Sequence, residues 1–177
     1  INEKHVDMVN IGEGFESITE LVSLMDSGKD YFDVKNIWFK YQGKIMKNEI
    51  RPVFGELDRL PYPDKDIFRE YFNISDNYLI MSSFGCPYHC TFCGNNLFLK
   101  LYKGKGSYIR RRSHKNVIEE LKIAKAKYNI KVVNFLDDVF TTDKKWLQVF
   151  CQTYKKEIGL PFRTITHPKF VDEDIIK

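Results

Sequence analysis

Cysteine is scarce in this sequence of 177 residues, and long apolar runs are missing. The four cysteines are too few for the disulfide framework of a small secreted domain, and no secretory signal pattern is visible. This cysteine usage favours a reducing, cytoplasmic setting. Because no run of about 18 apolar residues occurs, the sequence predicts no membrane span.

Acidic residues are also absent from position 77 to position 118, although the whole chain carries a net charge of only +4. That net charge is too small to indicate a polyanionic partner by itself. The local excess of positive charge would favour a bound anion. A solvated loop or, with Tyr102 and Tyr108 interleaved, an RNA-facing loop is the alternative, but the short patch argues against nucleic acid. The basic residues are Lys100, Lys103, Lys105, Arg110, Arg111, Arg112 and Lys115.

Three of the cysteines lie close together, with the spacing C-x3-C-x2-C at Cys86, Cys90 and Cys93. Three thiolates on one short loop can hold three irons of a cubane [4Fe-4S] cluster, which leaves one iron without a protein ligand. An open coordination position is typical of a catalytic metal centre. A structural zinc site is the alternative, but it needs a fourth ligand, and His89 is adjacent to Cys90 in the same tight loop.

The first 76 residues predict a small folded segment followed by a linker. A hydrophobic content of 43% is enough for a packed core. We expect a strand at 6–11, a helix at 18–25 and a hairpin at 36–47, joined by a turn at Gly12-Glu13-Gly14. Residues 50–76 contain three prolines and no periodicity, apart from a short helix at 66–72. We therefore divide the chain into segments 1–49, 50–76 and 77–177.

The second half alternates predicted strands and helices. Strands are expected at 78–83, 131–136 and 162–166. Helices are expected after Ser113, after Asp143 and near residue 172, with Ser113 and Asp143 as N-caps and Cys151 on the inner face of the second helix. This alternation predicts an α/β fold with a parallel sheet or barrel.

Polar residues follow these strands at the ends where ligands bind in α/β folds. Asp137 and Asp138 come directly after the second strand, and the cysteine loop follows the first. Thr164 and Thr166 share one face of the third strand. A turn with a nearby helix cap is the alternative interpretation of the two aspartates.

The cysteine loop, with Phe92 before the last cysteine, resembles the C-x3-C-x-aromatic-C signature of the radical S-adenosylmethionine (SAM) enzymes. The resemblance implies that the open iron binds SAM and reduces it to a 5′-deoxyadenosyl radical. It implies that Phe92 packs by the adenine and that a carboxylate at the strand edge binds the SAM ammonium, where many members carry Gly-Gly-Glu. The expected metal ligands are Cys86, Cys90 and Cys93, and the expected cofactor-binding residues are Gly85, Tyr88, Phe92, Gly94, Asp137, Asp138 and Thr166.

Segments 9–16, 55–64 and 137–143 resemble the cobalamin-dependent branch of that family, which includes methyltransferases and a porphyrin-ring cyclase. The implied fold is the first half of a partial (β/α)6 TIM-like barrel, preceded by the C-terminal edge of a Rossmann-like cobalamin-binding domain. Ile1 in place of Met and a helix start near residue 172 then indicate a fragment of a longer protein. None of the four histidines lies in the Asp-x-His-x-x-Gly motif that can ligate cobalt.

The resemblance implies cobalamin-linked methyl transfer or ring modification in the intact protein, with the isolated fragment inactive. A small-molecule substrate and a reductant such as flavodoxin or ferredoxin are the implied partners. One alternative is a tRNA methylthiolation enzyme, which would have a second cysteine trio upstream, whereas no cysteine precedes Cys86. The other alternative is a zinc-binding, RNA-facing module without enzymatic activity.

Overall fold

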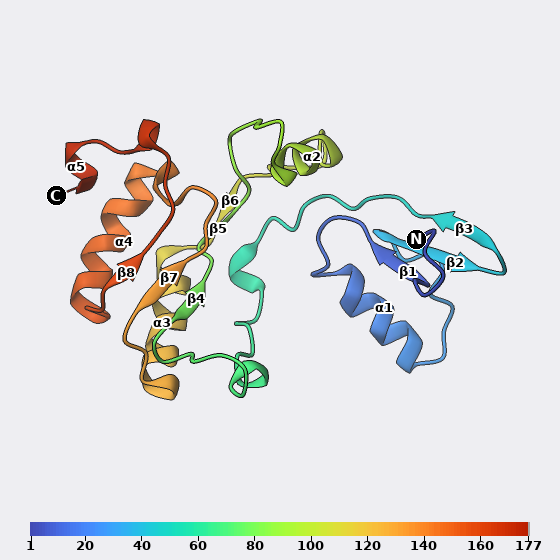
Figure 1. Cartoon of the computed structure of the whole chain (residues 1–177), viewed down its shortest axis with the longest axis horizontal. Coiled ribbons are helices and arrows are strands. Elements are labelled where there is room, and N and C mark those ends of the chain that lie inside the picture. Colours follow the sequence, from blue (N-terminus) through green and yellow to red (C-terminus); the bar gives the residue numbers. More distant parts are fainter. Residues whose placement is uncertain (177) are drawn as a thin grey trace. The chain divides into compact units, whose positions relative to one another are not determined.

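The computed structural model describes residues 1–176 and divides the chain into two compact units (Figure 1). The first unit consists of residues 1–55 and 88–108, and the second of residues 56–87 and 109 onward. The predicted segments 1–49, 50–76 and 77–177 therefore do not coincide with the compact units. Part of the predicted linker belongs to the second unit, and 21 residues after the first cysteine, 88–108, belong to the first.

The first unit contains an antiparallel sheet of β1 (Met8–Asn10), β2 (Ile37–Tyr41) and β3 (Lys44–Lys47), in that order. Alternation along β2 buries Ile37 and Phe39, which pack with Leu21 of helix α1 (Ser17–Asp26). The β2–β3 turn has two residues with positive φ, as a tight two-residue hairpin requires. The predicted strand, helix and hairpin are confirmed. The described strands of this unit form antiparallel pairs, so a Rossmann-like assignment stays a prediction.

Helix α2 (Gly94–Leu101) also belongs to the first unit and was not predicted. It packs beside the turn at residues 12–14. Gly12 has a φ of +83°, and a Cβ at this position would lie 2.1 Å from Tyr102 Oη. The same hydroxyl accepts a hydrogen bond of 2.6 Å from the Glu13 backbone N–H. Glycine is therefore required at position 12 by both conformation and space.

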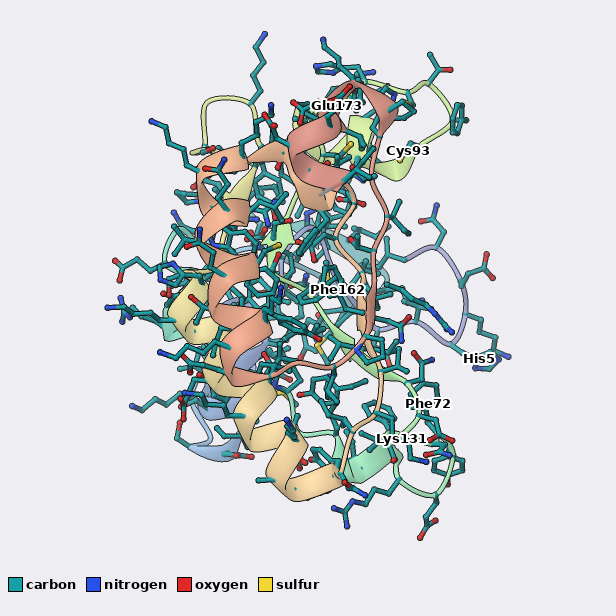
Figure 2. The ribbon with its side chains drawn as sticks, turned by 90° about the vertical axis from the view of Figure 1, so that its left-hand side faces the viewer. His5, Phe72, Cys93, Lys131, Phe162 and Glu173 are labelled. Carbon is teal, nitrogen blue, oxygen red and sulfur yellow. The ribbon has the colours of Figure 1, made fainter. Side chains whose placement is uncertain are left out.

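The second unit is built on a parallel sheet in the order β4 (Tyr78–Ile80), β7 (Val133–Phe135) and β8 (Phe162–Arg163). Helices α3 (His114–Tyr128) and α4 (Lys144–Glu157) pack against each other, and the short helix α5 (Glu173–Ile176) follows (Figure 1). The α/β fold with parallel strands is confirmed. Figure 2 shows Lys131, which precedes β7, at the lower end of this unit and Glu173 near its upper end.

The helices of the second unit begin where the sequence indicates. Ser113 Oγ accepts a hydrogen bond from the Asn116 N–H, and Asp143 Oδ1 accepts one from the Trp146 N–H, so both predicted N-caps are confirmed. The core between helices and sheet is rich in aromatic rings. Phe162 lies at mid-height beside α4 (Figure 2), with its ring centroid 5.2 Å from that of Tyr154.

Three local predictions are wrong. Residues 66–72 contain only a 3-10 turn at Asp66–Phe68, because aromatic side chains there remain exposed and no packing partner extends the helix. The third strand is two residues long instead of five. Cys151 is exposed and not in the core, since it lies one position beyond the inward stripe formed by Leu147, Phe150 and Tyr154. Partial burial of the thiol still raises its pKa, because it removes water from the charged form.

No helix within residues 1–176 is both long enough and apolar enough to cross a membrane.

Candidate cofactor site

The cysteine segment begins directly after β5 (Ser83–Phe84). Gly85 has a φ of +88°, a conformation that side chains other than glycine adopt only with strain, so it turns the chain into the cysteine loop. Cys86 is half-buried, Cys90 is exposed, and Cys93 is half-buried as the N-cap of α2. The boundary between the two compact units falls within the motif, between Pro87 and Tyr88.

The donor set of three thiols suits a [4Fe-4S] cluster with one open iron, whereas a structural zinc ion would need a fourth ligand. None of the three thiols forms a disulfide within the described residues. All three are within eight positions of one another, and thiolates are the usual ligands of iron–sulfur clusters. No group of three His, Cys, Asp or Glu side chains in residues 1–176 is gathered as it would be around a metal ion, so the metal assignment stays a prediction.

The other loop residues differ in exposure. The Phe92 ring is 91% exposed, which is unusual for so large an apolar side chain and leaves it available to a ligand. A Cβ added at Gly94 would meet nothing within 4 Å, so the backbone there is open to close approach. Tyr88 is half-buried and His89 is exposed. Their predicted roles as cofactor contacts stay predictions.

A short pair of strands joins the two ends of residues 85–109, which we call the cysteine excursion; this strand pair is its base. Strand β5 pairs antiparallel with β6 (Arg110–Arg111), with Ser83 opposite Arg111 and Phe84 opposite Arg110. The two ends of residues 85–109, which include the three cysteines and α2, are therefore held next to each other by this strand pair. The backbone N–H of Arg112 extends the contact by donating to the Ser82 carbonyl at 2.8 Å.

Asp137 is fully buried at the carboxyl end of β7 and holds this base in place. Its carboxylate accepts hydrogen bonds from the Ser82 N–H at 3.0 Å, from Ser82 Oγ at 2.6 Å and from Ser83 Oγ. Arg111 Nη1 lies 3.9 Å from Asp137 Oδ1. The carboxylate therefore links the segment after β4 to β7 and to β6.

Arg111 is itself enclosed by acceptors and rings. Its guanidinium donates to Ser82 Oγ at 3.0 Å, to the Phe140 carbonyl at 2.8 Å and to Thr142 Oγ1 at 3.1 Å. The Trp146 ring lies 4.5 Å from the guanidinium carbon, within cation–π range. Burial lowers the pKa of Arg111, and the nearby Asp137 charge opposes that shift. An arginine side chain stays charged at neutral pH in proteins, so Arg111 remains a cation here.

Arg112 forms a second buried ion pair. Its Nη2 lies 2.6 Å from Glu120 Oε2, and its Nη1 donates to the Met81 carbonyl at 2.9 Å. The Tyr78 hydroxyl donates to the other Glu120 oxygen at 2.9 Å. Burial, followed by the Glu120 charge, raises the pKa of Tyr78 far above its ordinary value. These contacts tie α3 to β4 and to Arg112, the residue that follows β6.

The arginines at 110–112 are therefore part of the fold and do not form a solvated basic loop. Arg110 and Arg112 are less than a tenth exposed, and Arg111 is half-buried. Sequence reasoning read them as a basic patch and missed their partners. No sequence motif marks Ser82, Ser83 or Glu120 as partners of these charged groups. Their contacts with Asp137 and Arg112 depend on residues that are distant along the chain.

The two aspartates after β7 face different environments. Asp137 is enclosed by Ser82, Ser83 and Arg111, whereas Asp138 is exposed. This burial argues against direct ligand contact by Asp137 and leaves Asp138 as the accessible carboxylate. Thr166 is exposed, and its hydroxyl shares a hydrogen bond with the buried Thr141 hydroxyl. The cofactor roles of Asp138 and Thr166 stay predictions.

Over most of its length, the chain is similar in sequence to two proteins that are named as methyltransferases. It is 34% identical, over 144 residues, to an uncharacterised methyltransferase of Pyrococcus horikoshii, a match that covers 79% of this chain and 30% of the relative. It is 32% identical to the cytidylyl-2-hydroxyethylphosphonate methyltransferase of Streptomyces wedmorensis, covering 93% of this chain and 36% of that protein. The chain thus spans about a third of the length of these relatives. No model of a protein family matches it.

Two solved structures share the fold. The cobalamin-dependent SAM radical enzyme OxsB, with aqua-cobalamin and SAM bound, superposes with a TM-score of 0.69 at 19% identity, over 96% of this chain and 25% of OxsB. The radical SAM methyltransferase TsrM of Kitasatospora setae, with cobalamin and a [4Fe-4S] cluster bound, gives 0.67 at 15% identity, over 96% of this chain and 35% of TsrM. The chain belongs to the cobalamin-dependent radical S-adenosylmethionine family, of whose members it spans a part.

Proposed function

We propose that the intact protein is a radical SAM enzyme that uses a [4Fe-4S] cluster, SAM and cobalamin for methyl transfer or ring modification of a small molecule. The observation that carries the proposal is the trio Cys86, Cys90 and Cys93, in the segment that follows strands β4 and β5 along the chain. The relationship to methyltransferases and the fold of two cobalamin-binding enzymes support it. When bound, such a cluster supplies the electron that cleaves SAM to methionine and a 5′-deoxyadenosyl radical.

The chain's own residues have distinct tasks in this proposal. The three thiolates hold the cluster. Phe92, exposed on the cysteine loop, packs against the adenine of SAM, and Gly94 lets that ligand approach the backbone. Asp138 accepts hydrogen bonds from the SAM ammonium, while Asp137 fixes the base of the loop. Flavodoxin or ferredoxin would deliver the electron.

The buried arginines favour this proposal over an RNA-facing module. A loop that binds RNA backbone needs accessible Lys or Arg side chains. Here Arg111 is engaged by Asp137 and Arg112 by Glu120, so two of the seven basic residues in the stretch already have buried partners. Part of the positive charge in this stretch therefore holds strands and helices together.

Anaerobic reconstitution with iron and sulfide tests the proposal. We expect about four irons and four sulfides per chain, and loss of this cluster when Cys86, Cys90 or Cys93 is replaced by Ala. The matched control is Cys151→Ala, which removes an exposed thiol from α4 and should leave the iron content unchanged. A full cluster in a variant that lacks two of the three motif cysteines would contradict the assignment.

A further inference from the structure

We propose that Asn95 is a positioning residue that raises the reduction potential of the cluster through a hydrogen bond to the sulfur of Cys93. Asn95 Nδ2 lies 3.7 Å from Cys93 Sγ, within the range for an N–H donor and a sulfur acceptor. The inference rests on the proposed function, because it assumes that Cys93 is a cluster ligand.

Local structure brings the two side chains together. Cys93 is the N-cap of α2, with extended backbone angles of φ −101° and ψ 138°, and Asn95 lies in the first turn of that helix. The Cys93 N–H donates to the Cys90 carbonyl at 3.1 Å, and the Asn96 N–H donates to the Cys93 carbonyl at 3.2 Å. The backbone on both sides of the sulfur is therefore held in place.

Tyr108 fixes the orientation of the Asn95 amide. Its hydroxyl donates a hydrogen bond of 2.7 Å to Asn95 Oδ1. The amide has one acceptor end and one donor end, so engaging the oxygen at Tyr108 directs the NH2 group to the sulfur. The flipped amide would place a carbonyl oxygen against the sulfur and an NH2 group against the hydroxyl.

Tyr108 is in turn held by two aromatic neighbours. Its ring stacks on Phe98 with centroids 6.4 Å apart and on Tyr102 with centroids 6.1 Å apart. Tyr102 is buried, and its hydroxyl accepts the hydrogen bond from the Glu13 N–H. A continuous series of contacts thus joins the turn at residues 12–14 to the sulfur of Cys93, entirely within the first unit.

The expected electronic effect has a definite sign. Reduction adds negative charge to a cluster, and a hydrogen-bond donor at a ligand sulfur stabilises that charge. Loss of the donor therefore disfavours the reduced form and moves the potential to more negative values. A hydrogen bond to a charged group is strong enough to change the ratio of reduced to oxidised cluster about tenfold, which is a shift of about 59 mV for one electron.

The test is an anaerobic redox titration of the reconstituted chain, followed by electron paramagnetic resonance, with iron measured in every sample. Asn95→Leu keeps the side-chain size but cannot donate, and we expect about tenfold less reduced cluster at a fixed potential. Tyr108→Phe keeps the ring but releases the amide, and should shift the potential in the same direction by less. The matched control is Asn96→Leu, whose backbone N–H still contacts Cys93, and its potential should equal that of the wild type.

The outcomes separate the inference from the proposed function. A wild-type chain that takes up no cluster would overturn both. A normal cluster whose potential is unchanged in Asn95→Leu, or shifted equally in Asn96→Leu, would overturn the inference alone. If Asn95→Leu loses iron, Tyr108→Phe decides, because it retains the asparagine; an unchanged potential in that variant would overturn the inference.

Discussion

Replacing Asp137 by Ala should destabilise the second unit strongly, even though the residue lies where a ligand-binding carboxylate was expected. The substitution removes three hydrogen-bond acceptor contacts with Ser82 and Ser83 and the ion pair with Arg111. Single hydrogen bonds to charged groups contribute about 1.5–3 kcal/mol, and removal of one partner from a buried ion pair costs about 3–5 kcal/mol.

We expect a loss of about 3 kcal/mol in the free energy of unfolding, at the lower end of the range for buried pairs. Arg111 would not be left without partners, because the Phe140 carbonyl and Thr142 Oγ1 still accept from its guanidinium. The two serines would lose more, since both hydroxyls are buried and aimed at the carboxylate. Asp137→Asn, which keeps the shape and part of the acceptor capacity, should cost less than Asp137→Ala.

Urea unfolding followed by tryptophan fluorescence can measure this change within the second unit. The chain has two tryptophans, Trp38 in the first unit and Trp146 in the second. Trp146 packs against Arg111, so in a Trp38→Phe background its emission reports on the network around Asp137. The matched control is Asp138→Ala, which removes an exposed carboxylate and should change stability by less than about 0.5 kcal/mol.

A result of less than about 1 kcal/mol for Asp137→Ala, with an unchanged denaturant slope, would refute the reasoning. So would an equal loss in Asp138→Ala. In that case the buried position of Asp137 would not reflect its contribution to the fold, and its predicted role as a direct cofactor contact would regain support.

Two further predictions concern the first unit and the last helix. Gly12→Ala should destabilise the first unit by more than about 1 kcal/mol, because the added Cβ is strained at φ +83° and also clashes with the Tyr102 hydroxyl oxygen. The control is Gly28→Ala, which also has positive φ but lies in open space and should cost less. Trp38 fluorescence during urea unfolding compares the stability of the two variants. The hydrogen bond from Lys144 and its charge lower the pKa of Asp172 below its ordinary 3.8, so the stabilisation exists above that pH and is lost as pH falls through the lowered value. Asp172→Asn should therefore be less stable than wild type in thermal melts at pH 7 but equal to it near pH 2, and equality at pH 7 would contradict the assignment.

Local sequence patterns were sufficient for most of the fold. The pattern at residues 36–47 predicted the hairpin of β2 and β3, and two N-caps predicted the starts of α3 and α4. Parallel pairing followed from the order of strands and helices. Helix α2 was missed because it is short and its apolar residues remain largely exposed, so it depends on contacts made by Tyr102 and not on its own pattern.

The metal-ligand prediction rests on one segment, since the three cysteines lie within eight residues of one another, and it stays a prediction. Asp137 and Asp138, by contrast, are chemically identical neighbours that nothing in the sequence distinguishes. Both lie just beyond the end of β7, and only one of them, Asp137, faces inward. Which one does so depends on Ser82 and Arg111, which are 55 and 26 positions away in the sequence.

The three consecutive arginines, Arg110, Arg111 and Arg112, also have roles that the sequence alone does not reveal. Three consecutive basic residues beside a cysteine motif indicate an anion site if only sequence is considered. In the fold, Arg111 is the last residue of the short strand β6, and Arg112 is the residue that follows it. Arg111 meets Asp137 and Trp146, whereas Arg112 meets Glu120 and the Met81 carbonyl. The sequence analysis expected the charges of Arg111 and Arg112 to favour a bound anion. In the structure these charges instead pair with Asp137 and Glu120 and connect the base of the cysteine excursion to the rest of the second unit. Neutralising it, as in Arg111→Met, should therefore weaken the fold before it weakens binding of any anion.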